Sequence, residues 1–148
     1  MITPGSGLNI LQFATALASG TAGSVAGVDA STGTDTITAF VVANDQFQLD
    51  ITVFGTTAGT AGGTLAATQF DAVAGTAAAI TAADVQTGDI GIVFDTTNSD
   101  LYFIEAGATF TSGTTTLATL LAAGAAFNIA DITSITGTLA ATDFNIIA

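Results

Sequence analysis

The sequence contains no lysine, arginine or histidine, but it contains 12 acidic residues, so its formal net charge is −12. No side chain can form a salt bridge or neutralise a phosphate, which excludes nucleic acid and an anionic membrane surface as partners. Carboxylates at this density repel one another, so a compact chain needs cations, salt or wide spacing between them.

Cysteine and tryptophan are also absent, and there is one tyrosine. Disulfides and thiolate metal sites are therefore excluded. A nucleophilic serine or threonine would have no histidine or lysine to act as its base. A carboxylate pair of the glycosidase type remains chemically open, but the shortage of aromatic residues disfavours a sugar-binding cleft. We therefore expect a protein that is not an enzyme.

Long unbroken apolar runs are lacking, although 49% of the residues are hydrophobic. Residues 1–28 and 106–130 carry no charge, but Gly, Ser and Thr interrupt both stretches, so we expect no membrane span. No positively charged segment of a signal peptide follows Met1. The missing basic residues nevertheless favour a place outside the cell or on its surface, and we expect any export signal elsewhere in the chain.

Ala, Thr and Gly are abundant and make up about half of the 148 residues. Such small, β-branched or turn-forming residues favour short strands and tight turns. We expect an all-β domain over residues 29–148, a β-sandwich or β-roll-like domain of short antiparallel strands with Gly-, Thr- and Asp-rich turns. Residues 1–28 are expected to form an uncharged N-terminal arm.

Alternation of apolar and polar residues points to strands in several places. Residues 35–54 alternate on both sides of an Asn-Asp pair at 44–45, which predicts a hairpin. Residues 90–104 place two apolar runs around a turn-forming segment and predict a second hairpin. Residues 114–123 fit a short helix or a strand, and their run of threonines favours a strand.

An internal repeat links two distant parts of the chain. The segment GTLAATQFDAVA at residues 63–74 recurs as GTLAATDFNIIA at 137–148, with a shorter echo at 80–85. Each copy predicts one tight turn that buries its first apolar residue and its Phe or Val. The uneven spacing of the copies does not fit a solenoid.

Two segments offer oxygen ligands of the kind that calcium prefers. Residues 33–38 match the second half of the nonapeptide G-G-x-G-x-D-x-U-x, and the turn at 95–100 carries two carboxylates and an amide. In both places the alternative is a structural role, at the start of a strand or in a solvated turn. The candidate calcium ligands are Asp29, Asp35, Asp95, Asn98 and Asp100.

The uncharged arm has one apolar cluster, formed by Leu8, Ile10, Leu11 and Phe13. This cluster is either the first strand of its own domain or an exchange strand that completes a neighbouring copy. Addition of a strand to an open sheet edge is a common route to β polymers.

Several short segments resemble, in the same order, the region that follows the repeats in RTX-type calcium-binding exoproteins. They are DTITAF, NDQFQL, VFG, IVFD, DLYF and LAATDF, at residues 35–40, 44–49, 53–55, 92–95, 100–103 and 139–144. The resemblance covers residues 27–148. It implies a β-sandwich that caps a β-roll, calcium binding outside the cell, and export by type I secretion machinery through an uncleaved C-terminal signal. The chain lacks the family's array of complete nonapeptides.

These observations predict a secreted structural protein that assembles with itself into an extracellular filament, sheath or surface layer, assisted by calcium. The first alternative is a calcium-binding secretion or adhesion module of RTX type. The second is an ice-binding protein, for which residues 34–38 supply the single resemblance to a T-x-T repeat.

Overall fold

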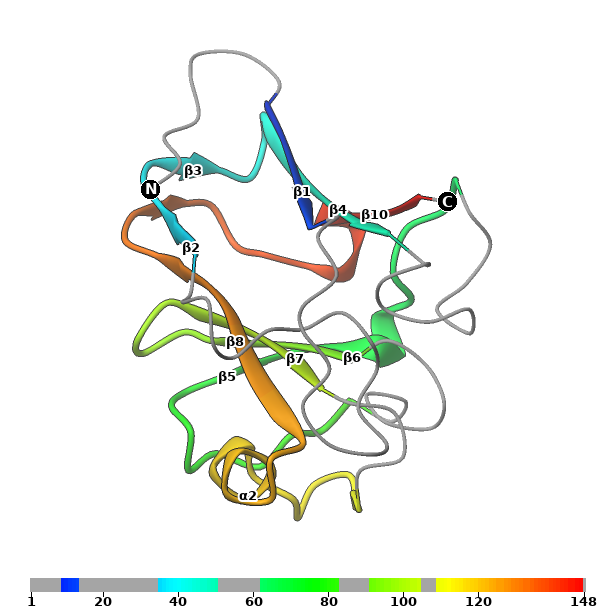
Figure 1. Cartoon of the computed structure of the whole chain (residues 1–148), viewed down its shortest axis with the longest axis vertical. Coiled ribbons are helices and arrows are strands. Elements are labelled where there is room, and N and C mark those ends of the chain that lie inside the picture. Colours follow the sequence, from blue (N-terminus) through cyan, green and yellow to red (C-terminus); the bar gives the residue numbers. More distant parts are fainter. Residues whose placement is uncertain (1–8, 14–34, 51–61, 83–90, 105–108, 148) are drawn as a thin grey trace.

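The computed structural model describes residues 9–13, 35–50, 62–82, 91–104 and 109–147 (Figure 1). Strands dominate this part of the chain, and the two 3-10 turns, labelled η, each lead directly into a strand. The elements in chain order are β1 (Asn9–Phe13), β2 (Asp35–Ile37), β3 (Phe40–Val41), β4 (Asp45–Asp50), η1 (Ala67–Gln69), β5 (Phe70–Val73), β6 (Gly91–Asp95), β7 (Asp100–Ile104), α2 (Leu117–Ala122), β8 (Ala126–Ile132), β9 (Ile135–Thr136), η2 (Ala141–Asp143) and β10 (Phe144–Ile147).

The described strands form a three-stranded sheet of order β1-β4-β10, a five-stranded sheet of order β2-β8-β7-β6-β5, and the pair β3-β9. The all-β class is therefore right, but the expected antiparallel arrangement is largely wrong. Only β6–β7 and β7–β8 pair antiparallel among these strands, and the other pairs are parallel. The alternating pattern determines which face of a strand is buried, and it does not determine the direction of the neighbouring strand.

The hairpin predicted for residues 35–54 is wrong, because β2, β3 and β4 belong to three different sheets. The turn at residues 44–45 does form. The Asn44 N–H donates to the Val41 carbonyl over 2.8 Å, and Asp45 Oδ2 accepts from the Val41 N–H over 2.7 Å. This turn leads β4 away from β3 and into the small sheet. Residues 51–54 lie outside the described part.

The hairpin predicted for residues 90–104 is confirmed over its described residues. Strands β6 and β7 pair antiparallel, from Gly91 opposite Ile104 to Asp95 opposite Asp100. Residues 96–99 form the turn between them. Because this pairing is local in sequence, the turn signal and the two apolar runs were sufficient to predict it.

The strand favoured for residues 114–123 is wrong, because residues 117–122 form helix α2. The threonine run ends at the helix N-cap, where Thr116 Oγ1 accepts from the Thr119 N–H over 3.1 Å. Leu117 and Leu120 then face the protein interior with 0% and 1% of their surface exposed. The threonines thus begin the helix, and the leucine spacing defines its buried face.

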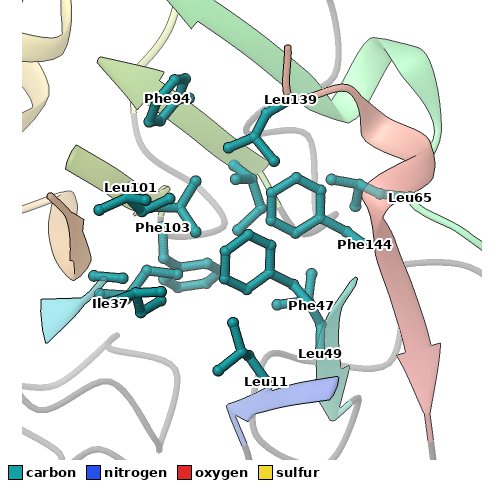
Figure 2. Packing of buried hydrophobic residues seen from close by; sticks show 14 of the residues in the cluster. Leu11, Ile37, Phe47, Leu49, Leu65, Phe94, Leu101, Phe103, Leu139 and Phe144 are labelled. Carbon is teal, nitrogen blue, oxygen red and sulfur yellow. The ribbon is translucent and has the colours of Figure 1, made fainter. Parts of the chain in front are cut away.

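The main hydrophobic core lies between the small sheet and one face of the five-stranded sheet (Figure 2). Phe40 stacks on Phe47 with ring centroids 4.6 Å apart, and Phe47 stacks on Phe144 at 5.0 Å. All three rings are fully buried. Offset stacking of this kind stabilises a core beyond the area that it buries.

The other face of the five-stranded sheet packs against α2 in a second apolar cluster, to which β6 and β7 contribute Val93, Tyr102 and Ile104. The neighbouring residues Ile92 and Phe103 point into the main core. Both faces of β6 and β7 are therefore covered, which explains why these strands are continuous apolar runs.

The two copies of the repeat form the same kind of tight turn, as predicted, but the predicted burial of the phenylalanine is complete only in the second copy, because Phe144 is fully buried and Phe70 is partly buried. Each has a buried leucine, Leu65 or Leu139, before a 3-10 turn that leads into a strand. In the first turn Gln69 Oε1 accepts from the Ala66 N–H over 3.0 Å. In the second turn Asp143 Oδ2 accepts from the N–H of Ala140, the residue equivalent to Ala66, over 2.8 Å. The shorter echo is described only as far as residue 82.

Candidate functional site

The predicted calcium ligands of the first group are only partly described. Asp29 lies outside the described residues. Asp35 is the first residue of β2 and lies opposite Ala130 of β8. Calcium binding by the segment 33–38 therefore stays a prediction.

Asp95, in the second group of predicted ligands, stabilises the turn between β6 and β7 by hydrogen bonds. Its carboxylate is fully buried, and Oδ1 accepts from the N–H groups of Gly75, Thr97 and Asn98 over 3.1, 2.8 and 3.2 Å. Oδ2 accepts from Asn98 Nδ2 over 2.8 Å. Asn98 thus presents its donor end to Asp95, and a cation at this turn would need the amide to rotate. In this structure both residues stabilise the turn.

Asp100 lies in a row of three carboxylates that crosses the five-stranded sheet. It is opposite Asp95 on β6 and opposite Asp131 on β8. The Tyr102 hydroxyl donates to Asp100 Oδ2 over 3.2 Å, and Asn128 Nδ2 donates to Asp131 Oδ1 over 2.7 Å. Like charges directly opposite one another destabilise a strand pair, so this row is an electrostatic weak point at neutral pH.

Burial raises the pKa of the Asp100 carboxyl above its ordinary value, and the negative charges of Asp131 and Asp95 add to this effect. The hydrogen bond from Tyr102 acts in the opposite direction, because it stabilises the ionised form. Burial also raises the pKa of Tyr102, with the charge of Asp100 as the second cause. The phenol therefore stays protonated and keeps its donor role.

Asp131 is a member of this row that the sequence analysis did not single out. It is the one charged residue of β8, which is the signal that could have singled it out. Its position opposite Asp100 depends on the register of β7 and β8, which shifts between Leu101 and Tyr102. Among the described residues, no group of three or more His, Cys, Asp or Glu is arranged to hold a metal ion.

The predicted self-association residues fall in or beside β1. Leu8 lies outside the described residues, whereas Ile10, Leu11 and Phe13 belong to β1, which pairs in parallel with β4 of the same chain. Leu11 is 7% exposed and joins the main core near Phe47 (Figure 2). The contact found is thus the in-chain alternative, and exchange of the same strand between copies stays a prediction.

The outer side of β10, at the opposite edge of the small sheet, is closed by the chain itself. The Gly62 N–H donates to the Ile146 carbonyl, and the Ile146 N–H donates to the Gly63 carbonyl, both over 2.8 Å. The Leu65 N–H donates to the Phe144 carbonyl over 2.9 Å. An edge that is covered in this way cannot accept another strand.

The outer edge of β5 is protected by a side chain. Asp71 Oδ1 accepts from the Ala72 N–H over 2.9 Å. Asp71 Oδ2 accepts from the Ala82 N–H over 3.1 Å and from both the N–H and the hydroxyl of Thr81. Within the described part of the chain, no strand covers the outer side of β1.

Comparison with known proteins found no match: no family model, no curated protein and no solved structure matches the chain. None of the helices in the described ranges has the length and apolar character that crossing a membrane requires.

Proposed function

We propose that this protein is an extracellular structural subunit that assembles with copies of itself into a filament, sheath or surface layer. One observation carries the proposal. In a chain of net charge −12, the first of the described strands, β1, is uncharged and forms an edge of the small sheet.

Electrostatics restrict where two copies can meet. Subunits of the same charge repel, and no basic side chain is present to form a complementary patch. An interface must therefore either neutralise carboxylates with cations or avoid them. The contact of β1 with β4 keeps most of its length free of carboxylates, because β1 is uncharged and Asp45, opposite Asn9, is the single charged residue among the five paired positions.

Calcium would assist by binding carboxylates and lowering the net charge of each subunit. Simple salt acts differently, because it screens charges over a Debye length of about 10 Å at 0.1 M without binding to them. The two effects are separable when ionic strength is held constant.

A secretion or adhesion module of RTX type is the second candidate. It is supported by the segments IVFD and DLYF, two of the segments that resemble the family, because they belong to the two paired strands of one hairpin. This reading shares export and calcium with the first, but it requires no self-assembly.

Sedimentation of the full chain tests the proposal. It is measured with calcium, with a chelator, and with sodium chloride at matched ionic strength. We expect species well above the 14.4 kDa monomer, growing with protein concentration and most abundant with calcium. A monomer in all three conditions, up to high protein concentration, would contradict self-assembly.

A further inference from the structure

We infer that copies of this protein are joined by exchange of β1, which leaves its own subunit and pairs with β4 of the next copy. The inference rests on the proposed self-assembly and identifies the joint. The acceptor is the side of β4 that the chain's own β1 covers in this structure.

The two strands that flank β4 differ in what lies on their outer sides. On one flank, β10 buries Phe144 and Ile146 completely, and residues 62–65 bond to its far side. On the other flank, no described strand lies beyond β1, and its Leu11 enters the core. Among the described residues, β1 can therefore leave β4 without breaking a pairing to another strand, which β10 cannot do.

The acceptor edge selects a strand of defined chemistry. Opposite residues 10–13 of β1 lie Gln46, Phe47, Gln48 and Leu49, which are uncharged, and Phe47 and Leu49 are fully buried. The fifth pair places Asp45 opposite Asn9, so one carboxylate lies at the end of this edge. Leu11, opposite Phe47, fills the apolar centre of this edge (Figure 2). A fitting strand is uncharged, with an apolar residue at its middle position. Residues 9–13 of a second copy meet this requirement, because they are the same strand.

The connection to the rest of the chain is long enough for exchange. Residues 14–34 separate β1 from β2, and an extended chain of that length spans at most about 70 Å. A compact chain of this size is only about 40 Å across. The strand can therefore reach a neighbour while the remainder of its subunit stays folded.

The joint would repeat from one copy to the next. The donated strand and the receiving edge are different surfaces, so the contact is heterologous. Each copy donates its β1 to one neighbour and receives the β1 of another neighbour on its β4. Such contacts continue into an open chain unless they close into a ring. All ladder hydrogen bonds of the in-chain pair are retained, so exchange loses no pairing.

The absence of cysteine allows a direct test by disulfide formation. Position 12 lies opposite position 48 in the parallel register, within the Cα distance that a disulfide requires. A Gln12→Cys chain and a Gln48→Cys chain are mixed before assembly and then oxidised. Exchange predicts a covalent pair made of one chain of each kind. The matched control replaces Gln48→Cys by Gln46→Cys, two residues out of register and about 8 Å away, and should give no such pair.

A second variant carries both Gln12→Cys and Gln48→Cys on one chain and is oxidised at high dilution. The disulfide locks β1 onto its own β4, so the locked chain should stay monomeric and should assemble after reduction. The inference is overturned if the locked chain assembles normally, or if the mixed variants assemble without forming the covalent pair. Both results would leave self-assembly intact through another contact. A wild-type chain that never assembles would instead contradict the proposed function itself.

Discussion

Asp95 is the residue on which the turn between β6 and β7 most depends, because its buried carboxylate accepts hydrogen bonds from three backbone N–H groups. The residues at 95–100 were recognised as a turn because Asp, Asn, Ser and Thr are turn formers. Their hydrogen bonds could not be predicted, because one donor is the Gly75 N–H, 20 positions away in sequence. The sequence identified the turn, and only the fold places Gly75 beside it.

Replacing Asp95 by alanine tests its structural role. Asp95→Ala removes the acceptor of three backbone N–H groups and leaves them partly buried without it. We expect the free energy of unfolding, measured by denaturant in a chelating buffer, to fall by about 2–3 kcal/mol. The matched control is Asp71→Ala, which also removes backbone hydrogen bonds but at a partly exposed site, and should cost about 1 kcal/mol or less.

A different pattern would restore Asp95 as a ligand. In that case Asp95→Ala would leave stability in the chelator unchanged and would abolish a stabilisation that calcium gives to the wild-type protein. Equal losses for Asp95→Ala and Asp71→Ala would contradict the importance assigned to burial.

The strands show at the scale of elements which pairings a sequence can reveal. The pair β6–β7 was predicted because its turn and both strands lie within 15 residues of sequence, 90–104. The pairs β1–β4 and β4–β10 were not predicted, because parallel partners are joined by long crossovers that leave no turn signal between them. The turn of each repeat was predicted, but the pairing of the second copy's strand, β10, with β4 was not.

The carboxylate row across β6, β7 and β8 makes the stability of the folded chain depend on pH. Because burial raises the pKa of Asp100, the folded chain holds a proton between the ordinary value of 3.8 and the raised value, whereas the unfolded chain has lost it. The contribution of Asp100 to stability is therefore fully present below pH 3.8 and is lost as pH rises through the raised value.

Asp100→Asn should remove this contribution to the pH dependence. The variant keeps an oxygen that accepts from Tyr102, and it removes the charge opposite Asp95 and Asp131. Thermal melts from pH 3.5 to 7.5 should show a variant more stable than the wild type at neutral pH, with the advantage shrinking in acid. The control Asp143→Asn removes the same charge away from the row. If both variants gave the same profile, the row would have no special role.

For the whole molecule, the net charge limits how copies can contact one another, and β1 lies where such a contact can form. A chain of charge −12 with no basic residue cannot use ion pairs between copies. Residues 62–65 close the outer side of β10, whereas β1 forms an edge among the described strands, and Asp45 is the single charged residue in its pairing with β4. The charge and the uncharged arm were evident from the sequence, but the acceptor strand was not, because it depends on the parallel register.

The most direct test of this account is the mass in solution of a chain that lacks residues 1–14. Losing β1 exposes the core around Leu11, which should lower stability by about 1.5–3 kcal/mol, so circular dichroism must first show that the truncated chain is folded. The control lacks residues 1–7 and keeps β1. Light scattering should then find a folded monomer for the longer deletion and large assemblies for the control. A folded chain without residues 1–14 that assembles like the wild type would contradict the account.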